Sequence, residues 1–144
     1  MRDFEELQIG QTAQKTTAIT SDLIAKFAVL TGDVNQVHLD DEYARDTFFG
    51  RRVAHGMISA SLIAALIGSE LPGAGSIYLS QNLEFKAPVF PGDEVTVALE
   101  ILEKDQASKK VRLRTLARNQ EDKVVIDGMA WVLLRPPRPS LSRK

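Results

Sequence analysis

The chain of 144 residues contains no cysteine. This absence excludes a disulfide framework, a thiolate metal site and a cysteine nucleophile, and it favours a reducing compartment. Neither sign of charge prevails, because 18 basic residues stand against 19 acidic ones. A formal net charge of −1 gives no general attraction for nucleic acid or for an acidic membrane surface. We therefore expect neither of them as a partner.

Long hydrophobic runs are also missing. The longest apolar stretch, MISASLIAALIG at 57–68, is interrupted by serines and is shorter than the roughly 20 residues that span a bilayer. The N-terminal segment MRDFEELQIG is acidic and lacks the apolar run of a secretory signal. These features predict a cytoplasmic protein that does not bind membranes.

The composition, 44% hydrophobic and 26% charged, is typical of a soluble globular protein, and the length fits one domain. The last ten residues, RPPRPSLSRK, contain three prolines, two serines and four basic residues. Such a composition favours a flexible basic tail. We expect one folded domain over residues 1–134 and a tail over 135–144.

Short elements are predicted in the first third of the chain. In order, they are an edge strand over 11–20, a helix over 23–30 capped by Ser21 and Asp22, and a second short helix that begins at Asp40 or Asp41. Gly32 follows the last apolar residue of the first helix, where a left-handed C-terminal cap is expected.

The sequence predicts one apolar helix over 56–68, and after it the pattern changes from helical to strand-like. Apolar residues cover nearly the whole circumference of this helix, so we expect it to be buried on most sides. Alternating apolar residues then predict four strands, over 76–90, 94–104, 110–119 and 123–134. The fold class is therefore α+β, with a curved antiparallel sheet wrapped around a long central helix. A sheet curved over one helix leaves an exposed edge, and pairing two such edges predicts a homodimer.

The segment TGDVNQVH at 31–38 places an acid, an amide and a base within a few positions. One interpretation is a helix stop followed by an Asx-turn, in which Asp33 and Asn35 bond nearby backbone N–H groups and His38 lies in a loop. The other is an acid–base pair, because imidazole titrates near neutral pH and a carboxylate tunes it. The spacing alone leaves both open.

The tripeptide HGM at 55–57 opens the apolar helix. The first turn of a buried helix presents unpaired N–H groups at the positive end of its dipole, and Gly56 has no side chain to block approach. Gly56 is therefore a candidate oxyanion site, unless the glycine only permits a tight entry into the helix. A histidine in the position of His55 is more often structural than catalytic.

Other chemistries find little support. The chain has two histidines, 17 residues apart, which is no common metal-ligand spacing, so we expect no metal. A serine hydrolase would need a G-x-S-x-G elbow, and nucleotide binding would need a glycine-rich phosphate loop. Neither pattern occurs in the sequence.

Three segments together resemble one family: TGDVNQVHLDDEYA (31–44), RRVAHGMISASLIAALIG (51–68) and SIYLSQNLEFKAPVFPGDEV (76–95). They are similar to the MaoC-like, (R)-specific enoyl-CoA hydratases, in the same order along the chain. The resemblance implies a single hot-dog fold that works as a homodimer with acyl-CoA tunnels near the interface. It also implies that Asp33 and His38 are the catalytic dyad, that the N–H of Gly56 binds the thioester oxygen, and that Asn35 holds the loop.

The sequence departs from the family pattern at two positions. Gln36 replaces the usual proline after the asparagine, which loosens the loop. Some relatives have a serine at the position of Ala64, which faces the acyl end in the family. The candidates for the acyl pocket are Met57, Ala64 and Ile67, and those for the CoA phosphates are Arg51, Arg52 and Lys86.

The implied reaction is the reversible (R)-specific hydration of trans-2-enoyl-CoA to (R)-3-hydroxyacyl-CoA, as in the short hydratases that serve polyhydroxyalkanoate synthesis. It needs no cofactor, since CoA is part of the substrate. The alternatives are a 3-hydroxyacyl-ACP dehydratase, an acyl-CoA thioesterase and a non-catalytic acyl-binding hot-dog subunit.

Overall fold

The computed structural model describes residues 2–135. Its elements are, in chain order, the 3₁₀ turn η1 (Phe4–Glu6), β1 (Thr12–Ala18), α1 (Ser21–Thr31), α2 (Gln36–Leu39), α3 (Asp41–Arg45), α4 (Gly56–Ser69), β2 (Ser76–Phe85), β3 (Glu94–Asp105), β4 (Lys110–Arg118) and β5 (Val124–Leu134). The expected basic tail lies outside the described residues, apart from Arg135.

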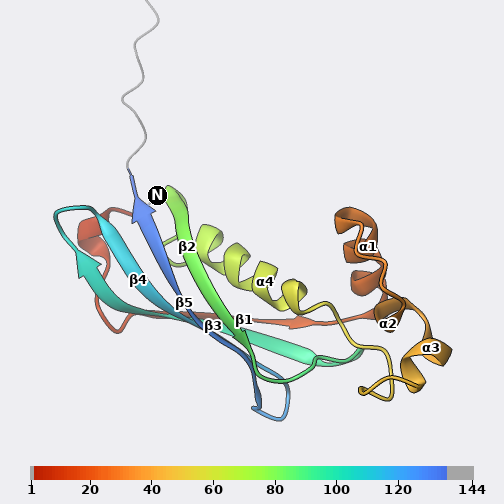
Figure 1. Cartoon of the computed structure of the whole chain (residues 1–144). Coiled ribbons are helices and arrows are strands. Elements are labelled where there is room, and N and C mark those ends of the chain that lie inside the picture. The colour runs from red at the N-terminus through yellow and green to blue at the C-terminus, as the bar shows by residue number, and fades with distance from the viewer. Residues whose placement is uncertain (1, 136–144) are drawn as a thin grey trace, which may run out of the picture.

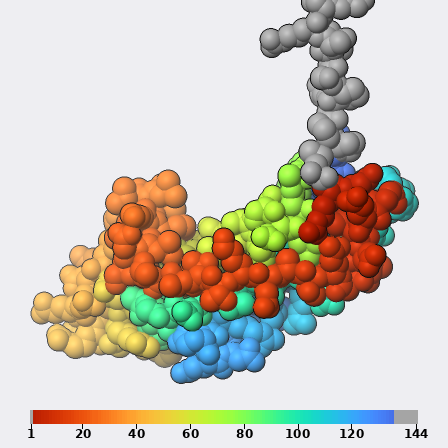
Figure 2. Space-filling model, turned by 180° about the vertical axis from the view of Figure 1, so that it is seen from behind, coloured from red at the N-terminus to blue at the C-terminus, as the bar shows by residue number. Residues whose placement is uncertain are grey.

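A five-stranded antiparallel sheet in the order β1-β3-β4-β5-β2 curves around α4 (Figure 1). The predicted α+β class and the central helix are therefore confirmed. β1 lies at one edge of the sheet, as predicted, and β2 forms the other edge. Figure 2 shows the N-terminal segment, in red and orange, running along one side of the molecule as far as α1.

The core lies between α4 and the concave face of the sheet. Ile63 and Leu66 of α4 are almost completely buried, and so are alternate residues of β3, namely Val95, Val97, Leu99 and Ile101. Burying one such side chain stabilises the fold by about 1.5–3 kcal/mol. Among the described residues, no helix has the length and apolar character needed to cross a membrane.

One face of α4 differs from the sequence prediction. Met57, Ser61, Ala65 and Gly68 form a stripe along the helix that is exposed in the single chain. The expected burial on most sides therefore fails along this stripe, because the sheet covers the opposite side of the helix. Apart from Met57, the stripe consists of small residues, which allow another backbone to approach closely.

The start of α1 differs from the sequence prediction. The N-cap of α1 is Thr20, whose Oγ1 accepts a hydrogen bond from the N–H of Leu23 at 3.0 Å, so the predicted caps Ser21 and Asp22 belong to the first turn instead. Gly32 ends α1 with φ of +77°, as predicted. α3 begins at Asp41, as predicted, with Asp40 as its N-cap, whereas the one-turn helix α2 was not expected.

Candidate active site

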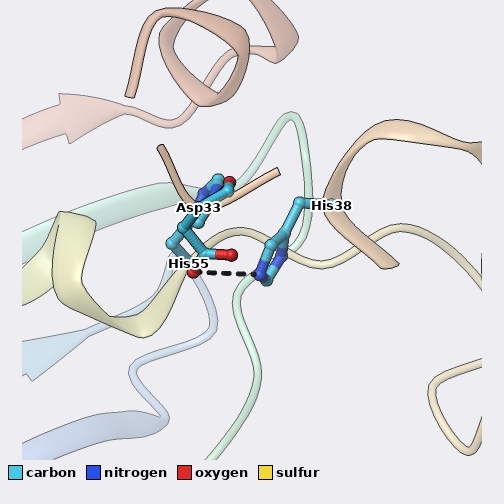
Figure 3. Close-up of side chains that lie close together, drawn as sticks. All are labelled: Asp33, His38 and His55. Carbon is cyan, nitrogen blue, oxygen red and sulfur yellow. Dashed lines mark hydrogen bonds and ion pairs between the residues drawn. The ribbon is translucent and has the colours of Figure 1, made fainter. Parts of the chain in front are cut away.

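Three chain segments meet beside the N-terminus of α4. Asp33 comes from the loop after α1, His38 from α2 and His55 from the residue before α4 (Figure 3). Each of the three offers a ligand or proton-accepting atom, and these atoms all lie within 4.8 Å of one another. The loop geometry thus brings together residues that share no helix face or strand.

The turn that holds Asp33 is built from local hydrogen bonds. The N–H of Asp33 donates to Oγ1 of Thr31 at 3.2 Å, and Oδ1 of Asp33 accepts from the N–H of Asn35 at 3.3 Å. Oδ1 of Asn35 in turn accepts from the N–H of Val37 at 3.2 Å and caps α2. The Asx-turn interpretation is therefore correct for the backbone, and it is this turn that brings the carboxylate to His38.

Gln36, which replaces the family's proline, is the first residue of α2. Proline is favoured there because the N–H of this position needs no helical partner and its φ is preset. Gln36 fits the same place, and its carbonyl accepts from the N–H of Asp40 at 2.9 Å. The substitution therefore leaves the one-turn helix intact.

The orientation of His38 follows from its hydrogen bond to the backbone. Its Nδ1 lies 2.7 Å from the carbonyl oxygen of Val53, and a carbonyl only accepts, so Nδ1 carries a proton. Nε2 is then the nitrogen that faces the reaction space, 3.9 Å from Oδ2 of Asp33. The side chain of His38 is 12% exposed and that of Asp33 is 53% exposed. A histidine held from behind and a solvated carboxylate thus flank one small gap.

Gly56 begins α4, the helix whose dipole points its positive end at this site. A Cβ at Gly56 would come within 2.7 Å of Cε1 of Phe85, so the ring of Phe85 packs directly over the glycine. Phe85 was not among the predicted site residues. Its only signal was its place on an alternating strand, which did not distinguish it from a core residue.

A cavity of about 630 Å³ opens next to these groups. His38, Asn35 and Gly56 line it, and its walls are mainly apolar, with Phe49, Met57, Phe85, Val89 and Val125 among them. Of the predicted acyl-pocket residues, Met57 lines this cavity, whereas Ala64 and Ile67 lie outside it. The helix rises about 1.5 Å per residue, so the latter two lie more than 10 Å further along α4 than Gly56.

The three basic candidates for binding the phosphates of CoA differ in their contacts and in whether they line the cavity. Lys86 lines the cavity and pairs with Glu84, and this hydrogen bond raises the pKa of Lys86 above its ordinary value. The guanidinium of Arg51 lies 3.6 Å from the ring centroid of Phe90. Arg52 is tied to Asp41, with 2.6 Å between Nε and Oδ1. Lys86 is therefore the candidate best placed for a ligand in the cavity.

A metal shared by the two histidines fits the geometry poorly. The rings of His38 and His55 stack with centroids 3.8 Å apart and an interplanar angle of 29°. The lone pair of an imidazole nitrogen lies in the plane of its own ring, so two stacked rings do not point at one ion. The expectation that the site needs no metal remains a prediction, and the stacking supports it.

A curved antiparallel sheet around one helix is the hot-dog fold, and in this chain an acid–base pair lies at the N-terminus of that helix. A family model for the MaoC like domain matches residues 4–123, and the chain belongs to this family. It is 43% identical to a 3-hydroxybutyryl-CoA dehydratase of Methylorubrum extorquens, over 90% of this chain and 82% of that protein. It is 42% identical to an (R)-specific enoyl-CoA hydratase of Rhodospirillum rubrum, over 91% of this chain and 90% of that protein.

A solved structure gives the same result. The (R)-hydratase from A. caviae, described as involved in PHA biosynthesis, superposes with a TM-score of 0.88 at 40% identity. The match covers 91% of this chain and 99% of that structure. The resemblance inferred from three sequence segments is confirmed.

Proposed function

We propose that the protein catalyses the reversible, (R)-specific hydration of trans-2-enoyl-CoA to (R)-3-hydroxyacyl-CoA. The observation that supports this most directly is the gap between Oδ2 of Asp33 and Nε2 of His38, which lies beside the apolar cavity that Gly56 also lines. The relatives named as hydratases and dehydratases catalyse the two directions of one reaction. The cysteine-free composition favours a cytoplasmic location.

In the proposed reaction, Asp33 and His38 both bond one water molecule. The pair takes a proton from this water as its oxygen bonds to C3 of the enoyl group. A proton is returned to C2 on the same face, so the net change is the addition of H and OH across the double bond. Each such acid–base contribution is worth about 10² to 10⁴ in rate. The reaction adds water across a double bond without a redox step, so CoA enters only as part of the substrate.

Gly56 supplies the second element of the proposal. Negative charge builds up on the thioester oxygen as water attacks, and the N-terminus of α4 offers backbone N–H groups and the positive end of a 14-residue helix. The missing Cβ leaves room for the ring of Phe85, which packs against the start of the helix and lines the cavity. The apolar cavity wall receives the acyl chain, and Lys86 is placed to meet a phosphate of CoA at the cavity.

We further infer a homodimer, formed through the edge strand β2. The large side chains Ile77, Tyr78 and Leu79 of β2 are 39–46% exposed, although they are apolar or aromatic. The opposite edge, β1, is shorter and carries exposed polar residues such as Gln14 and Lys15, which discourage strand pairing.

The alternatives of the same fold differ at testable points. The acyl-carrier-protein dehydratase pattern places a glutamate on the central helix, and α4 contains no carboxylate. The same absence counts against one class of thioesterase.

The deciding assay follows enoyl absorbance and free thiol together, with crotonyl-CoA and with crotonyl-ACP. Hydration of crotonyl-CoA without thiol release is expected. Thiol release would favour the thioesterase, a strong preference for crotonyl-ACP would favour the dehydratase, and no turnover would favour a non-catalytic subunit.

A further inference from the structure

His55 contacts both members of the proposed dyad but has no part in the proposed proton transfer. It is 3% exposed, and its Nε2 lies 2.9 Å from the backbone carbonyl oxygen of Asp33. One face of its ring stacks on His38, and the ring of Phe27 lies 5.0 Å away at an angle of 57°. The next residue is Gly56, so one side chain connects the acid, the base and the start of α4.

The hydrogen bond to Asp33 fixes which nitrogen of His55 is protonated. A carbonyl oxygen only accepts, so Nε2 carries the proton and donates. Nδ1 is then left buried, and it has no hydrogen-bond partner among the described residues. A phenyl ring would fill the same space without an unsatisfied nitrogen, so packing alone does not explain a histidine here. The Nε2 donor is what the imidazole adds.

The loop of Asp33 depends on this donor. Its other hydrogen bonds, to Thr31 at the end of α1 and from Asn35, reach only residues two positions away, and the carboxylate is largely solvated. Among the described residues, the hydrogen bond from His55 therefore ties Asp33 to a part of the chain outside its own loop. That part is the entry to α4, where Ala54 and Ile58 belong to the hydrophobic core.

We propose that His55 is the positioning residue of the dyad. It fixes the backbone of Asp33 through Nε2 and the ring of His38 through stacking, so both reacting groups take their place relative to Gly56. Without this link the Asp33 loop is free to shift, and a displacement of about 1 Å can cost roughly 10² in rate. This inference rests on the proposed hydratase function.

Two substitutions separate the donor from the ring. H55F keeps the ring and its packing but removes the donor. H55Q removes the ring but keeps an N–H at nearly the same reach from the backbone. We expect H55F to fold with an unchanged or raised melting temperature, to lose about 10²-fold in kcat and to keep its KM for crotonyl-CoA. H55Q should recover at least about tenfold of that loss.

The matched control is T115V. Thr115 is also a fully buried polar residue, and its Oγ1 accepts a hydrogen bond from Nε2 of Gln81 at 2.8 Å, within the sheet. T115V should lower the melting temperature and leave kcat unchanged. Wild-type kcat in H55F, or no gain of H55Q over H55F, would overturn the positioning role. An inactive wild-type enzyme would instead overturn the proposed function, so the two failures are distinguishable.

Discussion

Oδ2 of Asp33 and Nε2 of His38 face each other across 3.9 Å. This is longer than a hydrogen bond, and a water molecule to one side of the pair can lie at about 2.8 Å from both atoms. The two groups are thus spaced to share one water molecule. His38 is held from behind by Val53, which leaves Nε2 directed at the gap.

Removing either member of the pair should stop turnover without unfolding the protein. D33N keeps an oxygen that can accept the N–H of Asn35, and H38Q keeps a side chain that can reach Val53. Both variants should lose about 10² to 10⁴ in kcat, with melting temperatures close to wild type. The decay of enoyl absorbance measures kcat, and circular dichroism measures the melt. Substantial turnover by D33N would contradict the role of the carboxylate.

Gly56 and Phe85 should be energetically coupled. A Cβ at Gly56 would lie 2.7 Å from Cε1 and 2.9 Å from Cδ1 of Phe85. G56A should therefore push the ring toward the cavity and lower kcat/KM, whereas G56A/F85L should lose less than the two single variants predict together. A coupling of about 0.5–3 kcal/mol is expected for residues in contact. The double-mutant cycle measures it, and strict additivity would show that the ring does not obstruct the site.

Lys86 should contribute to binding and not to the chemical step. Its hydrogen bond with Glu84 raises its pKa, and a raised lysine pKa keeps the cation charged until the pH exceeds the ordinary value of 10.5. K86M should raise KM for crotonyl-CoA about tenfold with kcat unchanged. The ratio of the two KM values should stay constant between about pH 6 and about pH 9, and it should shrink at high salt.

The control for Lys86 is Lys26, an exposed lysine on α1 that pairs with Asp22 at 2.8 Å and does not line the cavity. K26M should leave KM unchanged. Equal KM values for K86M and wild type would remove Lys86 from the CoA site.

The dimer interface can be tested by adding charge to each sheet edge in turn. Leu79 on β2 is 45% exposed, and a lysine there should oppose the close approach of a second β2. L79K should therefore behave as a monomer in analytical ultracentrifugation, whereas Q14K on the β1 edge should behave as wild type. If L79K remains a dimer and Q14K becomes a monomer, the interface lies on β1, which would contradict the proposed β2 interface.

Much of the fold was predictable because local patterns agree with the global arrangement. The alternation of Val95, Val97, Leu99 and Ile101 predicts a strand with one buried face, and the structure has it. Gly32 predicts the end of α1 because a left-handed cap favours glycine. These features depend on neighbours in sequence, so one chain suffices to predict them.

The site was less predictable because its contacts are non-local. Asp33 and His55 are 22 residues apart and meet only through a side-chain bond to a backbone oxygen, for which the sequence gives no signal. Phe85 approaches Gly56 because β2 ends beside the start of α4, and strand alternation says nothing about that approach. The family resemblance pointed to Asp33, His38 and Gly56 as site residues. It did not reveal that His55 connects them.

The most direct test of the central claim is the chirality of the product. Purified protein is incubated with crotonyl-CoA, and the 3-hydroxybutyryl-CoA formed is separated on a chiral phase, with D33N as the parallel reaction. The proposed function predicts the (R) product from wild type and a product level near background from D33N. An (S) product would contradict the proposed (R)-specificity, and equal turnover by D33N would contradict the claim that Asp33 acts with His38 in the addition of water.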